Sequence, residues 1–173
     1  MIEHKYSTFW PRFCAGFVDG VILMPISLGC NYVLQHSESA GLRVLVFVVN
    51  SSLYLVYSIW MLGTRGQTLG KMACKIIVLD VSEKPLTIKQ AVLRDILGVV
   101  LLPFSLAIEI PRILQGVKIY EPNNITTIDW IIMYSSGMWL LIELITMLTN
   151  DKRRALHDFI AGSVVVRKPA AAS

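Results

Sequence analysis

Four apolar stretches, separated by short polar segments, dominate the hydrophobic pattern of this chain. They cover residues 13–34, 42–62, 88–108 and 125–149. Each is close to the roughly 20 residues that an α-helix needs to cross a bilayer core of about 30 Å. The pattern therefore predicts an all-α membrane protein with four transmembrane helices, folded as a single membrane domain over residues 1–173.

The polar segments 63–87 and 150–173 follow one plan. Each has a short helix-like stretch with charged residues around it, typical of a helix in the headgroup region, and then a short β-branched run, at 76–79 and 164–166. A shift of 87 positions superimposes the two segments. We therefore predict two parallel two-span repeats, each followed by an interfacial helix and a short cytoplasmic β-strand. Because a lone strand has unpaired edges, we expect the two strands to pair with each other.

Composition supports the membrane assignment and suggests an orientation. Of the 173 residues, 54% are hydrophobic and 16% are charged, whereas soluble domains have about 25% charged residues. Lysine and arginine outside the spans concentrate in the N-terminus, the first polar segment and the tail, and the opposite side has Arg43, Arg112 and Lys118. By the positive-inside rule, we expect both termini to be cytoplasmic. The net charge of +4 then reflects membrane orientation, and we expect no nucleic-acid binding.

Other chemical signals in the sequence are weak. Cys14, Cys30 and Cys74 have no paired spacing, so the sequence predicts neither a disulfide framework nor a metal site. Ser51 and Ser52 have no base at a matching depth. We therefore expect no cofactor, no catalytic residues and no enzyme activity.

Charged residues inside the apolar stretches are the candidate functional residues, because a charge in a bilayer is costly. Counting the helix rise places four of them at one depth: Asp19, Arg94, Asp95 and Glu143. Three carboxylates and one guanidinium would be net negative in a low dielectric, so one carboxyl should stay protonated or hold a cation. We expect Asp19 to be the main ligand, Glu143 its partner, and Arg94 to set their pKa values. The alternative is a structural ion-pair cluster that holds the helices in register, in which Arg94 pairs with Asp19.

Asp19 lies on a helix face that has little side-chain bulk. Ala15, Gly16 and Gly20 are its neighbours on that face. Small residues let a second helix pack closely against a polar group in a membrane. We therefore expect Asp19 to face protein instead of lipid.

The chain also contains several motifs in order. They are Arg12 and Asp19 in the first span, GQTLGK followed by KIIVLD, Arg94-Asp95 in the third span, and RRALHDFIAGSVVV in the tail. Together they resemble the RDD family of small membrane proteins, which is named for one arginine and two aspartates. The resemblance covers nearly the whole chain. It implies that Arg12 is the family's arginine and that Asp19 and Asp158 are its aspartates.

The resemblance also implies a bacterial inner-membrane location and transport, including sodium/proton exchange for some members. With the charge layer, this favours transport or exchange of a small cation, Na⁺ or H⁺, by a protein whose partner is the lipid bilayer. Because four helices make a thin wall for a pore, we expect a homo-oligomer. The alternative is a non-transporting scaffold that binds a partner protein or anionic lipid through its cytoplasmic ribbon and basic tail. An enzyme acting on lipid comes third.

Overall fold

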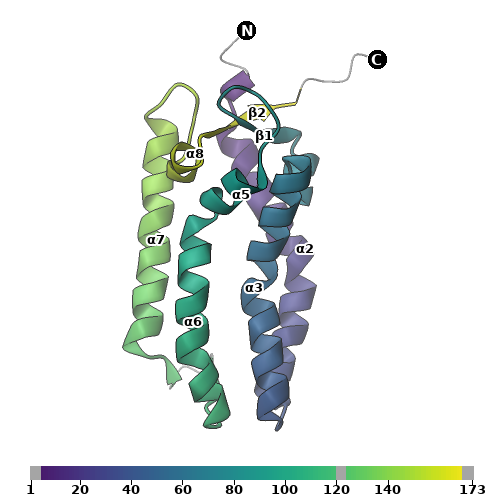
Figure 1. The fold of residues 1–173 in the computed structure, drawn as a ribbon, viewed down its shortest axis with the longest axis vertical. Coiled ribbons are helices and arrows are strands. Elements are labelled where there is room, and N and C mark those ends of the chain that lie inside the picture. Colours follow the sequence, from purple (N-terminus) through teal and green to yellow (C-terminus); the bar gives the residue numbers. More distant parts are fainter. Residues whose placement is uncertain (1–4, 120–123, 169–173) are drawn as a thin grey trace.

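Four long helices form the body of the protein in a computed structural model, which describes residues 5–119 and 124–168. They run alongside one another (Figure 1), and each contains a window with a mean hydropathy of 1.7 to 1.9. This confirms the prediction of four helices with the length and composition of membrane spans. The four are α2 (Phe9–His36), α3 (Ala40–Arg65), α6 (Ile96–Leu114) and α7 (Thr127–Leu148).

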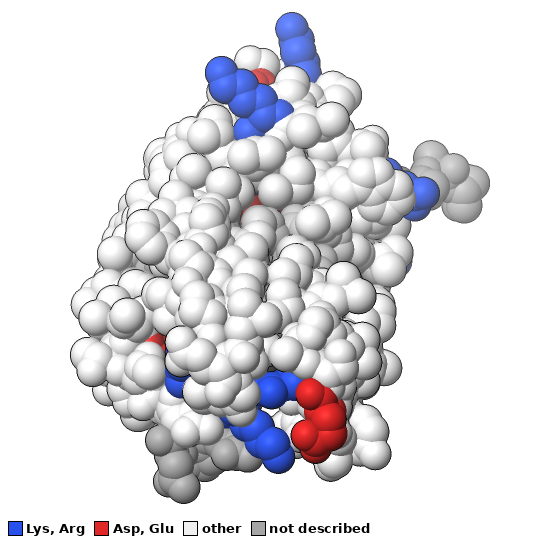
Figure 2. Space-filling view, turned by 60° about the horizontal axis from the view of Figure 1, so that its bottom comes forward, with Lys and Arg blue, Asp and Glu red and all other residues white. Residues whose placement is uncertain are grey.

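The surface of this bundle has the character that a bilayer requires. Figure 2 shows a broad uncharged face, with the charged side chains gathered toward its two ends. Large apolar side chains point outward from all four helices, for example Phe17, Leu45, Phe104 and Leu140. An apolar surface of this extent is not stable in water. The chain is therefore a multi-pass membrane protein.

The short elements gather at one end of the bundle, which we call the sheet end (Figure 1). The opposite end, where α2 joins α3 and α6 joins α7, is the loop end. Lys5 binds Glu83 and Lys168 bonds to Lys75, so the first and last described residues both lie at the sheet end. The short elements are α4 (Leu69–Ala73), β1 (Ile76–Asp80), α5 (Ile88–Arg94), α8 (Leu156–Ile160) and β2 (Ser163–Arg167).

The two strands form one antiparallel pair, in which Val78 lies opposite Val165. The predicted pairing of the two β-branched runs is therefore confirmed. Both valines are fully buried, because they pack in one apolar cluster with Ala15 of α2, Leu62 of α3 and Ala91 of α5. The sheet thus ties together helices that are far apart in the sequence.

The third predicted span, 88–108, differs from the structure. It is divided at Asp95, whose φ of −98° and ψ of 25° depart from helical values, into α5 and α6. The membrane helix α6 then begins later than predicted and continues past Glu109 to Leu114. The extension is stable because Glu109 forms an ion pair one turn along the same helix, with Arg112.

The helices pack unevenly. Helix α3 lies against both α2 and α6, whereas the main contact of α7 is with the short helix α8. The first turn of α7 is fixed by a capping box, in which Thr126 and Asp129 bond to each other's backbone N–H. This arrangement leaves space among α3, α6 and α7.

Candidate functional site

Asp19 is completely buried and is surrounded by hydrogen-bond donors. Its carboxylate accepts bonds from the Tyr57 hydroxyl at 2.7 Å, the Thr68 hydroxyl at 2.6 Å and the Gly70 N–H at 2.7 Å. Thr68 and Gly70 belong to the start of α4, so Asp19 attaches this short helix to α2. Asp19 faces protein, as the sequence predicted.

The close approach at Asp19 depends on a glycine that the sequence prediction did not use. A Cβ atom on Gly70 would lie 2.0 Å from the carbonyl oxygen of Ala15, which no side chain can tolerate. Gly16 and Gly20, in contrast, have open space beside them. The element that packs against Asp19 is therefore α4, and it packs through Gly70 and Ala15.

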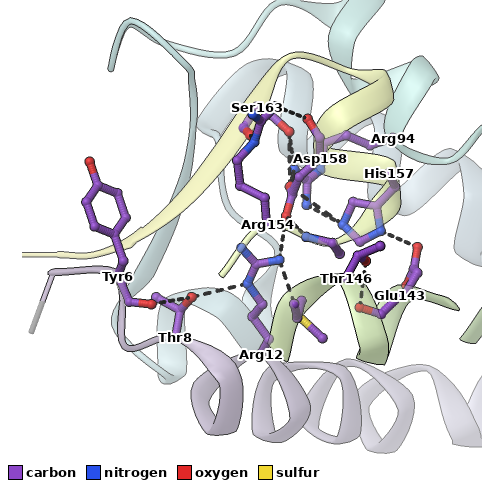
Figure 3. Close-up of polar contacts among 12 residues, drawn as sticks. Tyr6, Thr8, Arg12, Arg94, Glu143, Thr146, Arg154, His157, Asp158 and Ser163 are labelled. Atoms are coloured by element: carbon purple, nitrogen blue, oxygen red, sulfur yellow. Dashed lines mark hydrogen bonds and ion pairs between the residues drawn. The ribbon is translucent and has the colours of Figure 1, made fainter. Parts of the chain in front are cut away.

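Asp158 is also completely buried, and two arginines bind it (Figure 3). Arg12 of α2 donates to one carboxylate oxygen at 2.5 Å, and Arg94 of α5 donates to the other. The Ser163 hydroxyl and the Ala155 N–H also donate to this carboxylate, at 3.1 and 3.0 Å. Burial raises the pKa of Asp158, but Arg94 and Arg12 together hold it well below its usual range. Asp158 is therefore ionised, and it joins α8 to α2 and α5.

A chain of polar contacts leads from this cluster to α7. An Arg94 nitrogen lies 2.9 Å from Nε2 of His157, and Nδ1 of His157 binds Glu143. Since a guanidinium only donates, Nε2 accepts, and Nδ1 carries the proton that is donated to Glu143. Trp139 also donates to Glu143, at 2.7 Å. Four elements, α2, α5, α7 and α8, thus share one polar network (Figure 3).

A cavity of about 590 Å³ lies among α3, α6 and α7, next to this network. We call it the sheet-end cavity. Its apolar lining includes leucines from α3 and α6 such as Leu55 and Leu101. Its polar lining includes Ser58, Lys71, Arg94, Asp95, Glu143 and His157.

Two groups on the polar wall have distinctive surroundings. Asp95, at the break between α5 and α6, accepts a hydrogen bond from Ser58 at 2.7 Å. Lys71 extends into the cavity from α4. Burial, and after it the nearby Arg94, lower the pKa of Lys71 from 10.5 to about 8, although Asp19 and Asp95 partly oppose this. Within the described ranges, no group of three or more histidine, cysteine, aspartate or glutamate residues has the geometry of a metal site.

Comparison with known proteins identifies the family. The RDD family model matches residues 6–162, which is most of the chain. The protein belongs to the RDD family. No curated protein and no solved structure matches the chain. The resemblance that the motifs indicated is therefore confirmed.

In this RDD protein, the predicted charge layer divides into two sites. Arg94 and Glu143 are linked through His157, and Asp95 lines the same cavity. Asp19 lies in a separate site, and none of its described contacts reaches Arg94. The pairing of Arg94 with Asp19 that the structural alternative required is not found, because the carboxylate that Arg94 binds is Asp158.

Sequence reasoning missed two residues of the RDD protein's cavity. Lys71 was assigned to an interfacial helix, and His157 was expected, like Asp158, to pair near the cytoplasmic surface with Arg153, Arg154 or Arg12 instead of lining a site. The position of His157 directly before Asp158 was the one available signal. Lys71 had none, because α4 is oriented by contacts with Asp19 that spacing does not reveal.

Proposed function

We propose that this RDD protein exchanges a small cation for protons across the membrane, and that Asp95 and Glu143 hold the cation in the sheet-end cavity. The observation that carries the proposal is the cavity itself, which is lined by two carboxylates, one from the break between α5 and α6 and one from α7. Carboxylate oxygens suit small hard cations. Ionisable residues within membrane helices are functional-site candidates by default.

The charges around the cavity support exchange. Asp95, Glu143, Asp158 and, beside Lys71, Asp19 contribute four negative charges, and the two arginines bound to Asp158 contribute two positive charges. Lys71 adds a third positive charge while it is protonated. Since its pKa is about 8, Lys71 loses its proton close to physiological pH, and the surroundings of the cavity then become more negative by one charge. A cation in the cavity and a proton on Lys71 therefore compete.

We also propose that the two halves of the chain are a twofold repeat. α4 and α8 have five residues each, and so do β1 and β2. The residue before each strand, Lys75 or Gly162, has a positive φ of 54° or 60°. Val78 and Val165 are the middle residues of their strands and lie opposite each other. This register is the one that a twofold axis through the centre of the sheet would produce.

The proposed orientation follows from the basic residues at the sheet end, and the proposed assembly follows from the contacts of α7. Lys5, Lys168 and the basic segment after α7 lie at the sheet end, which by the positive-inside rule faces the cytoplasm of a bacterial cell. α4 and α8 then lie at the cytoplasmic interface. Because α7 has few contacts with the other long helices, we expect a homo-oligomer in which a second copy covers it. Reporters fused after Ser173 and inserted at Asn123 should lie on opposite sides of the membrane.

Flux through liposomes tests the function. Purified full-length protein, reconstituted with a pH-sensitive dye inside, should move protons when Na⁺ is added outside. Asp95→Asn and Glu143→Gln should each lower this rate at least about tenfold, because the cation loses one of two nearby charges. Glu38→Gln is the matched control, since Glu38 is an exposed carboxylate in the α2–α3 loop. Its rate should equal that of the wild type.

The same flux experiment distinguishes exchange from the alternative function, a non-transporting scaffold. If folded wild-type protein moves no protons in response to Na⁺ or K⁺, the exchange proposal is overturned. A scaffold that holds a partner protein or anionic lipid at its sheet end then becomes the better account. Size-exclusion chromatography of each variant ensures that only folded protein is compared.

A further inference from the structure

A second cavity, of about 500 Å³, lies between α6 and α7 toward the loop end. We call it the loop-end cavity. Glu109 and Arg112 of α6 and Asp129 of α7 form its polar wall, and Phe47 and Trp130 are among its apolar residues. None of these residues lines the sheet-end cavity. Sequence reasoning missed Glu109 because the predicted third span ended one residue before it.

Glu109 has an unusual environment. It is 7% exposed, and its Oε1 accepts a bond from Arg112 at 2.6 Å. Its other oxygen, Oε2, is buried and has no hydrogen-bond partner among the described residues. A buried carboxylate oxygen without a donor is costly. Either a proton on the carboxyl group, shared with Asp129, or a bound cation would satisfy it.

The charges near Glu109 support this. The carboxyl groups of Glu109 and Asp129 interact with each other, and Arg112 lies 3.6 Å from Asp129. The second terminal nitrogen of Arg112 is already used, because it donates to the backbone oxygen of Asn124. Two carboxylates thus share one guanidinium, which leaves one net negative charge in the cavity. A proton or a small cation would neutralise it.

The two cavities are neighbours along the same pair of helices. Ser105 of α6 and Ile132 of α7 line both of them. Glu109 lies 14 residues after Asp95, which corresponds to about 20 Å along the helix direction. Carboxylates therefore occur at two depths in the space between α6 and α7, and Ser105 and Ile132 line both cavities.

We propose that the loop-end cavity is a second cation site, in which Glu109 and Asp129 bind either a proton or a small hard cation such as Na⁺. The proposal that this cavity binds a cation depends only on its own geometry. The further proposal that it is the loop-end entrance of a pathway between α6 and α7, with Ser105 and Ile132 as the constriction, rests on the proposed function. A purely structural ion pair explains Oε1 of Glu109 and leaves Oε2 without a partner.

Carbodiimide labelling tests the site directly. A hydrophobic carbodiimide reacts with protonated carboxyl groups in apolar surroundings, and peptide mass spectrometry locates the product. In full-length protein reconstituted in liposomes, Glu109 should be labelled when choline is the only added cation. Labelling should fall at least about tenfold when Na⁺ replaces choline at constant ionic strength, because the cation displaces the proton. Glu38, exposed at the same end, is the control and should show no Na⁺-dependent change.

Substitutions test whether Asp129 shares the cation with Glu109. Asp129→Asn should raise the Na⁺ concentration that protects Glu109 at least about tenfold, because one of the two charges on the cation is lost. Glu143→Gln, in the other cavity, should leave that concentration unchanged. No labelling of Glu109, or labelling that Na⁺ does not reduce, would overturn the proposal. If Na⁺ protects Glu109 but the protein moves no ions, the loop-end site stands and the transport proposal is overturned. If the protein moves ions but Na⁺ does not protect Glu109, transport stands and the loop-end site is overturned.

Discussion

Asp19 and Asp158 are both completely buried, yet they are stabilised in different ways. Two hydroxyl groups and one backbone N–H surround Asp19, and all three donors are neutral. Two guanidinium groups bind Asp158. Neutral donors are directional and fix the position of a neighbouring segment, whereas guanidinium groups also cancel the charge. Asp19 therefore positions a neighbouring segment, whereas Asp158 also neutralises two buried arginines.

The two sites nevertheless have one structural role. Asp19 lies on a long helix and binds the start of α4, while Asp158 lies on α8 itself and binds long helix α2 and short helix α5. The helices α4 and α8 are thus each held by one buried aspartate, Asp19 or Asp158. With Arg12, these two aspartates connect the elements of the sheet end, and neither of them lines the two cavities.

Of the substitutions that compare these two sites, the replacement of Asp158 should cause the largest loss of stability. Asp158→Asn leaves Arg12 and Arg94 buried without the carboxylate they share, which should lower the free energy of unfolding by about 3 to 5 kcal/mol. Thermal unfolding of the purified protein in detergent measures this, with the exposed Asp151→Asn as control. Because the pKa of Asp158 is lowered on folding, its contribution is complete above its unfolded value near 4 and declines as the pH falls below that.

A double variant sharpens the result. If Asp158 acts through its two arginines, Arg12→Gln should restore part of the stability that Asp158→Asn loses, because one uncompensated charge is removed. If the double variant instead loses as much stability as the two single variants added together, Arg12 and Asp158 do not act as an ion pair.

Gly70→Ala should have the next largest effect, because it tests the close packing at Asp19. The added methyl group meets the Ala15 carbonyl at 2.0 Å, so α4 must move away from α2. Overpacking of this kind costs about 1 to 3 kcal/mol. Gly137→Ala in α7 is the matched control, since nothing lies within 4 Å of the added methyl group. Equal melting temperatures for the two variants would show that α4 is not held tightly.

Asp19→Asn should be milder than Asp158→Asn, and this is the direct test of the comparison. Oδ1 accepts from Tyr57 and Gly70, and asparagine keeps an oxygen for both. Its NH₂ group then faces the Thr68 hydroxyl, which can rotate to accept. The expected loss is about 1 kcal/mol, and no buried arginine loses its partner. A loss as large as that of Asp158→Asn would mean that Asp19 compensates a positive charge.

Local patterns in the sequence were sufficient for the elements of the fold. Runs of apolar residues predicted the four long helices, and the β-branched runs predicted the two strands and their pairing. Thr87 and Gln90 form the capping box at the start of α5, where the third predicted span began. The helices, the strands and the cap depend on residues that are neighbours along the chain, so periodicity and composition reveal them, whereas the pairing of the strands followed from their unpaired edges.

Side-chain partners were harder to predict. Counting residues along a helix gives depth in the membrane and says nothing about position within its plane, so Asp19 and Arg94 were paired although they face different neighbours. Arg94 instead binds Asp158, which the tail brings back over the bundle. Glu109 was missed because the predicted span was ended at the first charged residue after the apolar run, although the pairing of Glu109 with Arg112 lets α6 continue.

Lys71 gives the smallest change in stability and the clearest pH dependence. Lys71 is charged below its pKa of about 8 and neutral above it, so Na⁺ uptake by the wild type should rise as the pH increases through about 8. Lys71→Met removes the competing proton while keeping a long apolar side chain. Uptake by this variant should already be high below pH 8 and should change little across that range. Lys84→Met, an exposed lysine at the same end, should retain the wild-type profile. If Lys71→Met has that same profile, the pH dependence comes from another group, and the proton on Lys71 does not compete with the cation.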